Sequence, residues 1–183
     1  MFEVARLWER EAMCAALVAW LRDEPDPKVR EHAAWLLKHL GSATALPAML
    51  ELVRSEAEPL IVRRWLLDAL ERLVQSRAAS WREVGGVVMS LLRHADASIR
   101  DGAVGIVAAL ERSDEKRRLL VDLLRTDDDE TVLSSAVHAL SSALPIQLDP
   151  VVTDRLLGHP SPRVQRSVMD FIERSKRSAA KTP

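Results

Sequence analysis

The residues that could do chemistry are five histidines, one cysteine and an acidic run, and their spacing fits neither a metal site nor a catalytic group. His32 and His39 are seven residues apart, about 10 Å along a helix axis and too far to share one metal ion. The run Asp127–Glu130 lacks the spacing of a calcium loop, and its place at a helix start explains it. Cys14 lies in an apolar segment and is expected to be a small buried hydrophobe. No phosphate-binding glycine loop or Ser/His/Asp arrangement is recognisable. We therefore expect no metal, no cofactor and no enzymatic activity.

Charge and hydropathy limit the class of partner. The chain of 183 residues has 26 Lys and Arg against 27 Asp and Glu, so no whole-molecule basic field exists to attract nucleic acid or anionic lipid. No apolar run approaches the ~18 residues of a membrane-spanning helix, and the N-terminus lacks the apolar region of a signal peptide. We expect a cytoplasmic protein with a protein or peptide partner, binding neither a membrane nor, in the main interpretation, nucleic acid.

A short sequence motif, which we call the anchor phrase, occurs five times and indicates which elements position these residues; the first residue of each copy is its anchor. Its first residue is Val or Ile, usually followed by Arg, at Val29, Val62, Ile99, Val132 and Val164. The intervals of 33, 37, 33 and 32 residues are typical of a repeat array. The residues four, five, seven and eight positions after each anchor are apolar in every copy, which predicts the buried stripe of an amphipathic helix.

The positions predicted to be buried share this spacing in all five copies. They are Ala33, Ala34, Leu36, Leu37, Leu66, Leu67, Ala69, Leu70, Ala103, Val104, Ile106, Val107, Ala136, Val137, Ala139, Leu140, Val168, Met169, Phe171 and Ile172.

A second helical segment precedes each of these helices. The five segments are predicted at about 3–22, 44–54, 81–93, 114–125 and 150–158. Helix starts are marked by capping residues, by proline or by the Ser80–Glu83 capping box. The capping residues are Asp26, Asp96, Asp128 or Asp129, Asp149 and Ser161.

Strand signals are absent, and the predicted fold is therefore all-α. We predict a right-handed α-solenoid of about five helix–turn–helix repeats within residues 1–174. The repeats are expected at about 3–41, 44–76, 80–112, 113–144 and 149–175, and residues 175–183 are expected to be a disordered tail.

The anchors carry a resemblance to the short bacterial form of the HEAT-repeat family, in which an Asp–x–x–Val–Arg phrase opens the second helix. Asp26-Pro-Lys-Val29-Arg30 and Asp96-Ala-Ser-Ile99-Arg100 match it, while the fourth and fifth copies have Leu133 and Gln165 in place of the Arg. The resemblance implies that the second helices line one concave face. It also implies that the Asp and Arg residues hold adjacent repeats together, so Asp26, Arg30, Arg63, Asp96 and Arg100 are expected to be structural.

The residues that would point outward from the second helices form the predicted binding surface. They change along the chain from aromatic and charged to Gly, Ala and Ser, with Ser134 among the outward serines, and then to charged again. We expect a trough for a partner helix or extended peptide, with Trp35 and Trp65 as anchors; alternatively, Trp65 packs against the neighbouring repeat. The candidate partner-binding residues are His32, Trp35, Lys38, His39, Arg64, Trp65, Asp68, Arg72, Gly102, Gly105, Ser135 and His138.

The main functional prediction is a non-catalytic protein-binding adaptor, scaffold or regulatory subunit, either monomeric or weakly dimeric. One alternative is a DNA-binding or alkylated-base glycosylase-type protein, because such glycosylases have HEAT-like helices and use aromatic and acidic residues. Phycobilin lyases are also HEAT-like, but no chromophore site is marked here. A third alternative is a self-assembling structural protein, because Phe2, Trp8 and Trp20 lie in the first segment and Phe171 and Ile172 in the last.

Overall fold

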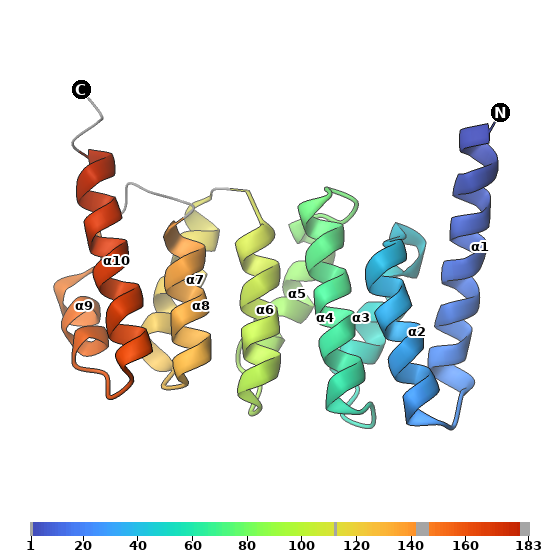
Figure 1. Cartoon of the computed structure of the whole chain (residues 1–183), viewed down its shortest axis with the longest axis horizontal. Helices are drawn as coiled ribbons and strands as arrows, with labels where there is room; N and C mark the ends of the chain where they lie inside the picture. Colours follow the sequence, from blue (N-terminus) through green and yellow to red (C-terminus); the bar gives the residue numbers. More distant parts are fainter. Residues whose placement is uncertain (1, 112, 142–146, 180–183) are drawn as a thin grey trace. The chain divides into compact units, whose positions relative to one another are not determined.

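The computed structural model describes residues 2–111, 113–141 and 147–179, with side chains described from residue 9 onwards. Every regular element in these ranges is helical, so the predicted all-α fold is confirmed. The chain divides into two compact units, Met1–Arg93 and His94–Pro183. The third predicted repeat, at 80–112, contributes one helix to each unit (Figure 1).

In unit 1, the helices pair as the repeat pattern predicts. Helix α1 packs on α2, α3 packs on α4, and the two second helices, α2 and α4, lie side by side. The described elements are α1 (Phe2–Asp23), α2 (Pro27–Leu40), the 3-10 helix η1 (Ala43–Ala45), α3 (Leu46–Arg54), α4 (Leu60–Gln75) and α5 (Trp81–Leu91).

In unit 2, three second helices lie in a row with α8 in the middle, in contact with both α6 and α10. Helix α7 packs on α8, and α9 packs on α10. The described helices are α6 (Ala97–Ala109), α7 (Asp114–Thr126), α8 (Glu130–Ser141), α9 (Pro150–Leu157) and α10 (Pro162–Ala179).

The predicted caps set the starts of most helices. The carboxylates of Asp26, Asp96 and Asp149 each accept a backbone N–H two residues ahead, at 2.8 Å. Of the two candidates before α8, Asp129 is the cap, because its carboxylate accepts the N–H groups of Thr131 and Val132. The Ser80–Glu83 capping box is present at the start of α5. These caps satisfy N–H groups that a helix leaves without partners at its first turn.

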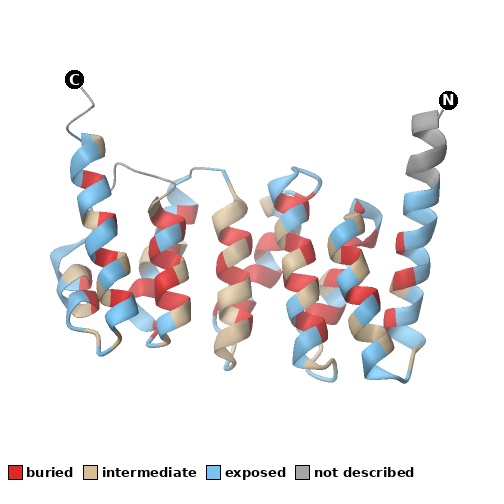
Figure 2. Cartoon of the chain, viewed as in Figure 1, coloured by how far each residue is buried: buried red, intermediate tan, exposed pale blue. Residues whose placement is uncertain are grey.

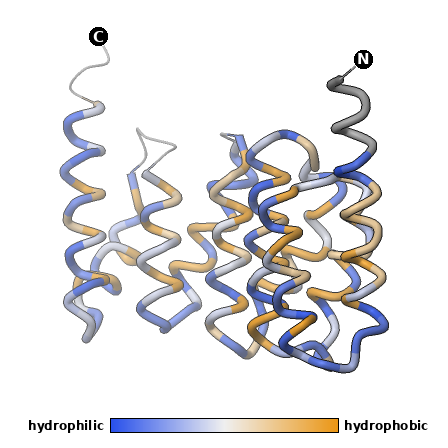
Figure 3. Tube along the Cα trace, turned by 45° about the vertical axis from the view of Figure 1, so that its right-hand side comes forward, coloured by the Kyte–Doolittle hydropathy of each residue, from blue (hydrophilic) through white to orange (hydrophobic). Residues whose placement is uncertain are grey.

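The core follows the repeated stripe of apolar positions. Figure 2 shows buried residues recurring along the helices between exposed ones, and Figure 3 shows hydrophobic and hydrophilic residues alternating along the helices. Of the twenty predicted positions, all but Leu36, Met169 and Ile172 are buried. Met169 is 47% exposed: the described residues contain no helix beyond α10 that would cover it.

Two other expectations are wrong in detail. Ser134, predicted to point outward from α8, is buried, because α8 has α6 on one side and α10 on the other. Helix α10 continues to Ala179, whereas disorder is predicted from Ser175. The continuation has a physical reason, since Ser175 is buried and Glu173 accepts a hydrogen bond from Arg177 one turn later. Residues 180–183 lie outside the described residues.

In unit 1, Arg30 bonds adjacent repeats together, as the resemblance implies. The Arg30 guanidinium donates to the carbonyl oxygen of Glu24 at 2.6 Å and lies 3.4 Å from the carboxylate of Glu58, in the loop before α4. Arg63 is buried, and its Nε donates to the carbonyl oxygen of Val53 at 2.9 Å. Arg30 therefore joins α2 to the loop before it and to the next repeat, and Arg63 joins α4 to α3 of its own repeat.

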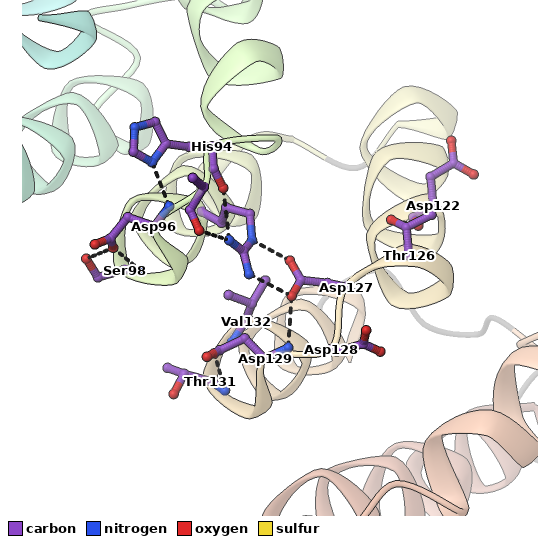
Figure 4. A network of polar contacts seen from close by, with 12 residues as sticks. His94, Asp96, Ser98, Asp122, Thr126, Asp127, Asp128, Asp129, Thr131 and Val132 are labelled. Atoms are coloured by element: carbon purple, nitrogen blue, oxygen red, sulfur yellow. Dashed lines mark hydrogen bonds and ion pairs between the residues drawn. The ribbon is translucent and has the colours of Figure 1, made fainter. Parts of the chain in front are cut away.

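In unit 2 the corresponding contact is a two-pronged ion pair. The Arg100 guanidinium donates to the two carboxylate oxygens of Asp127 at 2.6 and 3.0 Å, and also to the carbonyl oxygens of His94 and Ala95. Asp127 accepts the N–H of Asp129 as well (Figure 4). Burial alone would raise the pKa of Asp127, but the hydrogen bonds from Arg100 and Asp129 outweigh it and lower the pKa below its ordinary value. The expected inter-repeat partner, Asp96, instead caps its own helix.

A further arginine binds the same loop from the other side. The guanidinium of Arg155, on α9, donates to the carbonyl oxygens of Leu124 and Asp127 and to the carboxylate of Asp128. The segment Asp127–Asp129 between α7 and α8 is therefore bonded to the repeat before it and to the repeat after it. This network fixes the positions of α6, α8 and α9 in unit 2.

Candidate partner-binding surfaces

The α2 and α4 helices of unit 1 carry eight of the twelve predicted binding residues, and none of the eight is buried. His32, Trp35, Lys38 and His39 lie on α2, and Arg64, Trp65, Asp68 and Arg72 lie on α4. Because the two helices pack side by side, these side chains form one surface, which we call the α2–α4 face.

Trp35 is the main apolar side chain of the α2–α4 face. It is 42% exposed, and its ring lies 4.5 Å from the imidazole of His39, centre to centre, with the two planes tilted by 59°. His39 is one helical turn away, so the contact orients the indole and reduces the entropy lost on binding. An exposed, pre-oriented Trp flanked by charged residues is typical of an interface anchor.

Lys38 joins the two helices of the face. Its ammonium lies 2.6 Å from the carboxylate of Asp68 and 4.8 Å from the centre of the Trp65 ring, over which it stacks. Trp65 is half-buried, and its indole N–H has no hydrogen-bond partner among the described residues. Trp65 is thus partly covered, with Lys38 of the neighbouring repeat over its ring, while Trp35 is exposed.

The other four predicted residues lie in unit 2. Gly102, Gly105 and Ser135 are half-buried on α6 and α8, and His138 on α8 is exposed. The two tryptophans predicted as anchors thus lie in unit 1, and the small-residue segment lies in unit 2.

Between α8 and α10 there is a small polar cleft of about 80 Å³, which we call the α8–α10 cleft. It is lined by Val137, His138, Ser141, Ser167, Asp170, Phe171 and Arg174. Only His138 of these was a predicted site residue. The sequence contains a signal for Asp170 and Arg174: they stand six and ten positions after Val164, as Asp68 and Arg72 stand after Val62.

A larger cavity of about 750 Å³ lies at the ends of α9 and α10. Its lining is mainly apolar and includes Leu148, Pro150, Phe171 and Ile172, with Asp154 and Lys176 as charged members. Sequence reasoning missed this cavity because it assigned Phe171 and Ile172 to the core or to a dimer contact.

Among the described residues, no group of three or more His, Cys, Asp or Glu side chains is placed to hold a metal ion. None of the described helices is both long and apolar enough to cross a membrane. Cys14 is buried, and burial raises the pKa of its thiol.

These features define a protein of the α-solenoid class, built from helical repeats. Residues 14–81 match the family model of HEAT repeats, which confirms the resemblance over the first two copies of the anchor phrase and the following loop. No curated protein matches the sequence.

Solved structures support the same fold. The chain is 17% identical to a chain in the complex of CpcE and CpcF of phycocyanin lyase from Nostoc sp. PCC7120, with a TM-score of 0.65, covering 91% of this chain and 66% of that one. It is 18% identical to a designed armadillo repeat protein in complex with the peptide (KR)4, with a TM-score of 0.58 and coverage of 94% and 85%. A computationally designed armadillo repeat protein for modular peptide recognition matches at 19% identity and a TM-score of 0.59, with coverage of 93% and 85%. At such identities the likeness concerns the fold alone.

Proposed function

We propose that the protein is a non-catalytic adaptor that binds a protein or peptide partner on the α2–α4 face. The observation that carries the proposal is Trp35, which is exposed, in ring contact with His39 and part of a face formed by two helices that pack side by side. Interface energy concentrates in such Trp and Arg residues, with polar groups at the rim.

The architecture of related folds supports a peptide as the partner. Two similar structures are designed armadillo proteins, one bound to a peptide and the other intended for modular peptide recognition. The α2–α4 face has the alternation of charges that an extended peptide can match, with Arg64 and Arg72 exposed and the Lys38–Asp68 ion pair between the helices. Electrostatic matching of this kind contributes mainly to specificity and to the association rate.

The test is a peptide selected from a random display library on the intact protein, with its affinity then measured for variants by fluorescence anisotropy. Trp35→Ala should weaken binding by at least about tenfold, the loss of a typical hot-spot residue. Trp20→Ala is the matched control, because Trp20 is also a tryptophan, is 55% exposed and lies on α1, which is not one of the two helices of the α2–α4 face. Selected peptides whose affinity is unchanged in Trp35→Ala, or which lose as much in Trp20→Ala, would show that the face is not the binding surface.

Self-association is a second candidate function, favoured by one observation on α1. Met13 and Trp20 are exposed, and their spacing of seven residues puts them on one side of the helix. If this stripe drives assembly, light scattering over a concentration range will show a dimer that Trp20→Ala dissociates and Trp35→Ala does not. A monomer at all concentrations would exclude it.

A further inference from the structure

The surface residues of α4 recur on α10. Counted from the anchors Val62 and Val164, four outward positions carry the same residue types in both helices. The pairs are Arg64 and Arg166, Asp68 and Asp170, Glu71 and Glu173, and Arg72 and Arg174. Each helix also packs against the second helix of the preceding repeat, α4 on α2 and α10 on α8. Each unit therefore contains the same charged pattern in the same kind of helix pair.

The two pairs differ at the positions that face this pattern. In unit 1, Lys38 of α2 reaches across to Asp68 at 2.6 Å and stacks on Trp65. In unit 2, the residue equivalent to Lys38 is Ser141, and the residue equivalent to Trp65 is Ser167. Both replacements shorten the side chain, and in unit 2 the α8–α10 cleft opens at this place, lined by Ser141, Ser167 and Asp170.

Asp170 lines this cleft and is exposed. No side chain of the described residues pairs with Asp170, and Glu173 beside it is paired with Arg177. The cleft volume of about 80 Å³ is several times what one water molecule needs. The cleft therefore has an anion, two hydroxyl groups and room for the end of a side chain.

We propose that the α8–α10 cleft binds a lysine side chain of the partner, as Lys38 occupies the equivalent place in unit 1. This inference rests on the proposed function only for the source of the lysine, which is the partner. The ammonium would lie against the carboxylate of Asp170, and the hydroxyls of Ser141 and Ser167 would accept its remaining hydrogen bonds.

The cations near the cleft do not disfavour this occupant. His138 and Arg174 line the cleft, and Arg166 lies one turn before Asp170. The equivalent cations Arg64 and Arg72 lie beside Asp68 in unit 1, where the carboxylate nevertheless pairs with Lys38. The arginines on the same helix as each carboxylate thus match. On the facing helix, Ser141 stands in place of the internal lysine, and His138 stands where unit 1 has Trp35.

The test uses Nα-acetyl-lysine N-methylamide as the probe and follows the backbone amides of the full chain by NMR titration. We expect shifts at residues of α8 and α10 around Asp170 and none at α2 and α4. Asp170→Asn should weaken the probe by about fivefold, the value of one partly exposed ion pair. Ser141→Lys should place an internal ammonium in the cleft and abolish the shifts.

Two matched controls make the result decisive. Lys38→Ser should open the equivalent place in unit 1, so that the probe newly shifts amides of α2 and α4. The same probe acetylated on its Nε atom has no charge and should leave the cleft unshifted. Shifts that persist in Ser141→Lys and Asp170→Asn, an equal response to the acetylated probe, or a response to inorganic phosphate in place of the probe would each overturn the proposal. Binding of selected peptides to the α2–α4 face is measured separately, so either proposal can fail alone.

Discussion

The substitution Asp127→Ala should destabilise unit 2 by about 3 kcal/mol. It removes an acceptor whose side chain is 4% exposed and which receives two hydrogen bonds from Arg100 and one from the N–H of Asp129. Breaking a buried ion pair by removing one partner costs roughly 3 to 5 kcal/mol. The lower end applies because the Arg100 guanidinium keeps its hydrogen bonds to the carbonyl oxygens of His94 and Ala95.

The assay is urea unfolding of the full chain, followed by circular dichroism and by tryptophan fluorescence. All five tryptophans lie in unit 1, so fluorescence reports that unit while circular dichroism reports both. Asp127→Ala should lower the midpoint of the helical signal, and hydrogen exchange should accelerate most in α6 to α8.

The matched control is Asp128→Ala, one residue along the same loop. The Asp128 side chain is 90% exposed and pairs with Arg155, and a pair this exposed contributes less than about 1 kcal/mol. Equal losses in the two variants, or a loss below about 1 kcal/mol in Asp127→Ala, would refute the reasoning that burial gives this ion pair its strength.

Three other outcomes follow from the structure. The pKa of Asp127 is lowered by hydrogen bonds that outweigh burial, and the pKa of Asp96 is lowered by the hydrogen bond from Ser98. The stability that these two carboxylates contribute is therefore present above the unfolded-state pKa of about 3.9 and is lost as the pH falls through their lower folded-state pKa values. Acid unfolding should consequently start at a higher pH in Asp127→Asn than in Asp128→Asn. Gly86→Ala should stabilise by up to about 1 kcal/mol, since a Cβ there meets nothing within 4 Å, whereas Gly85→Ala should destabilise, because its Cβ would lie 2.8 Å from the Trp81 ring; thermal unfolding of the two variants checks the opposite signs. Lys116→Met should cost about 1 to 3 kcal/mol in urea unfolding, because the buried ammonium donates to the carbonyl oxygens of Ala108 and Leu110 at the end of α6.

Most of the fold could be predicted from the sequence because it depends on local periodicity. The apolar stripe and the caps Asp26, Asp96 and Asp149 identify the helices, since both signals act within one or two turns. The predictions of burial were wrong where the burial of a side chain depends on a neighbouring helix. Ser134 is buried because α8 lies between two helices, and Met169 is exposed because the described residues provide no helix to cover it.

The candidate site was less accessible to sequence reasoning, because side-chain contacts across helices depend on geometry. The spacing identified Lys38, Trp65 and Asp68 as neighbours on a surface, but their mutual contact follows from how α2 packs on α4. The same holds for Arg100: Asp96 is used by its own helix, and the acceptor, Asp127, is 27 residues away. The boundary between the two units could not be predicted from the composition of the sequence, because it falls inside a predicted repeat and not in a linker between repeats.

The loop Asp127–Asp129 has a mechanical consequence. Arg100 holds it from the preceding repeat, and Arg155 from the following one. If a single molecule is pulled from its C-terminus, α9 cannot detach without releasing the loop, and the loop also holds α6 in place through Arg100. Unit 2 should therefore unfold in one force step rather than repeat by repeat. For the same reason, a single repeat of unit 2 cannot be replaced by another without disturbing its neighbours.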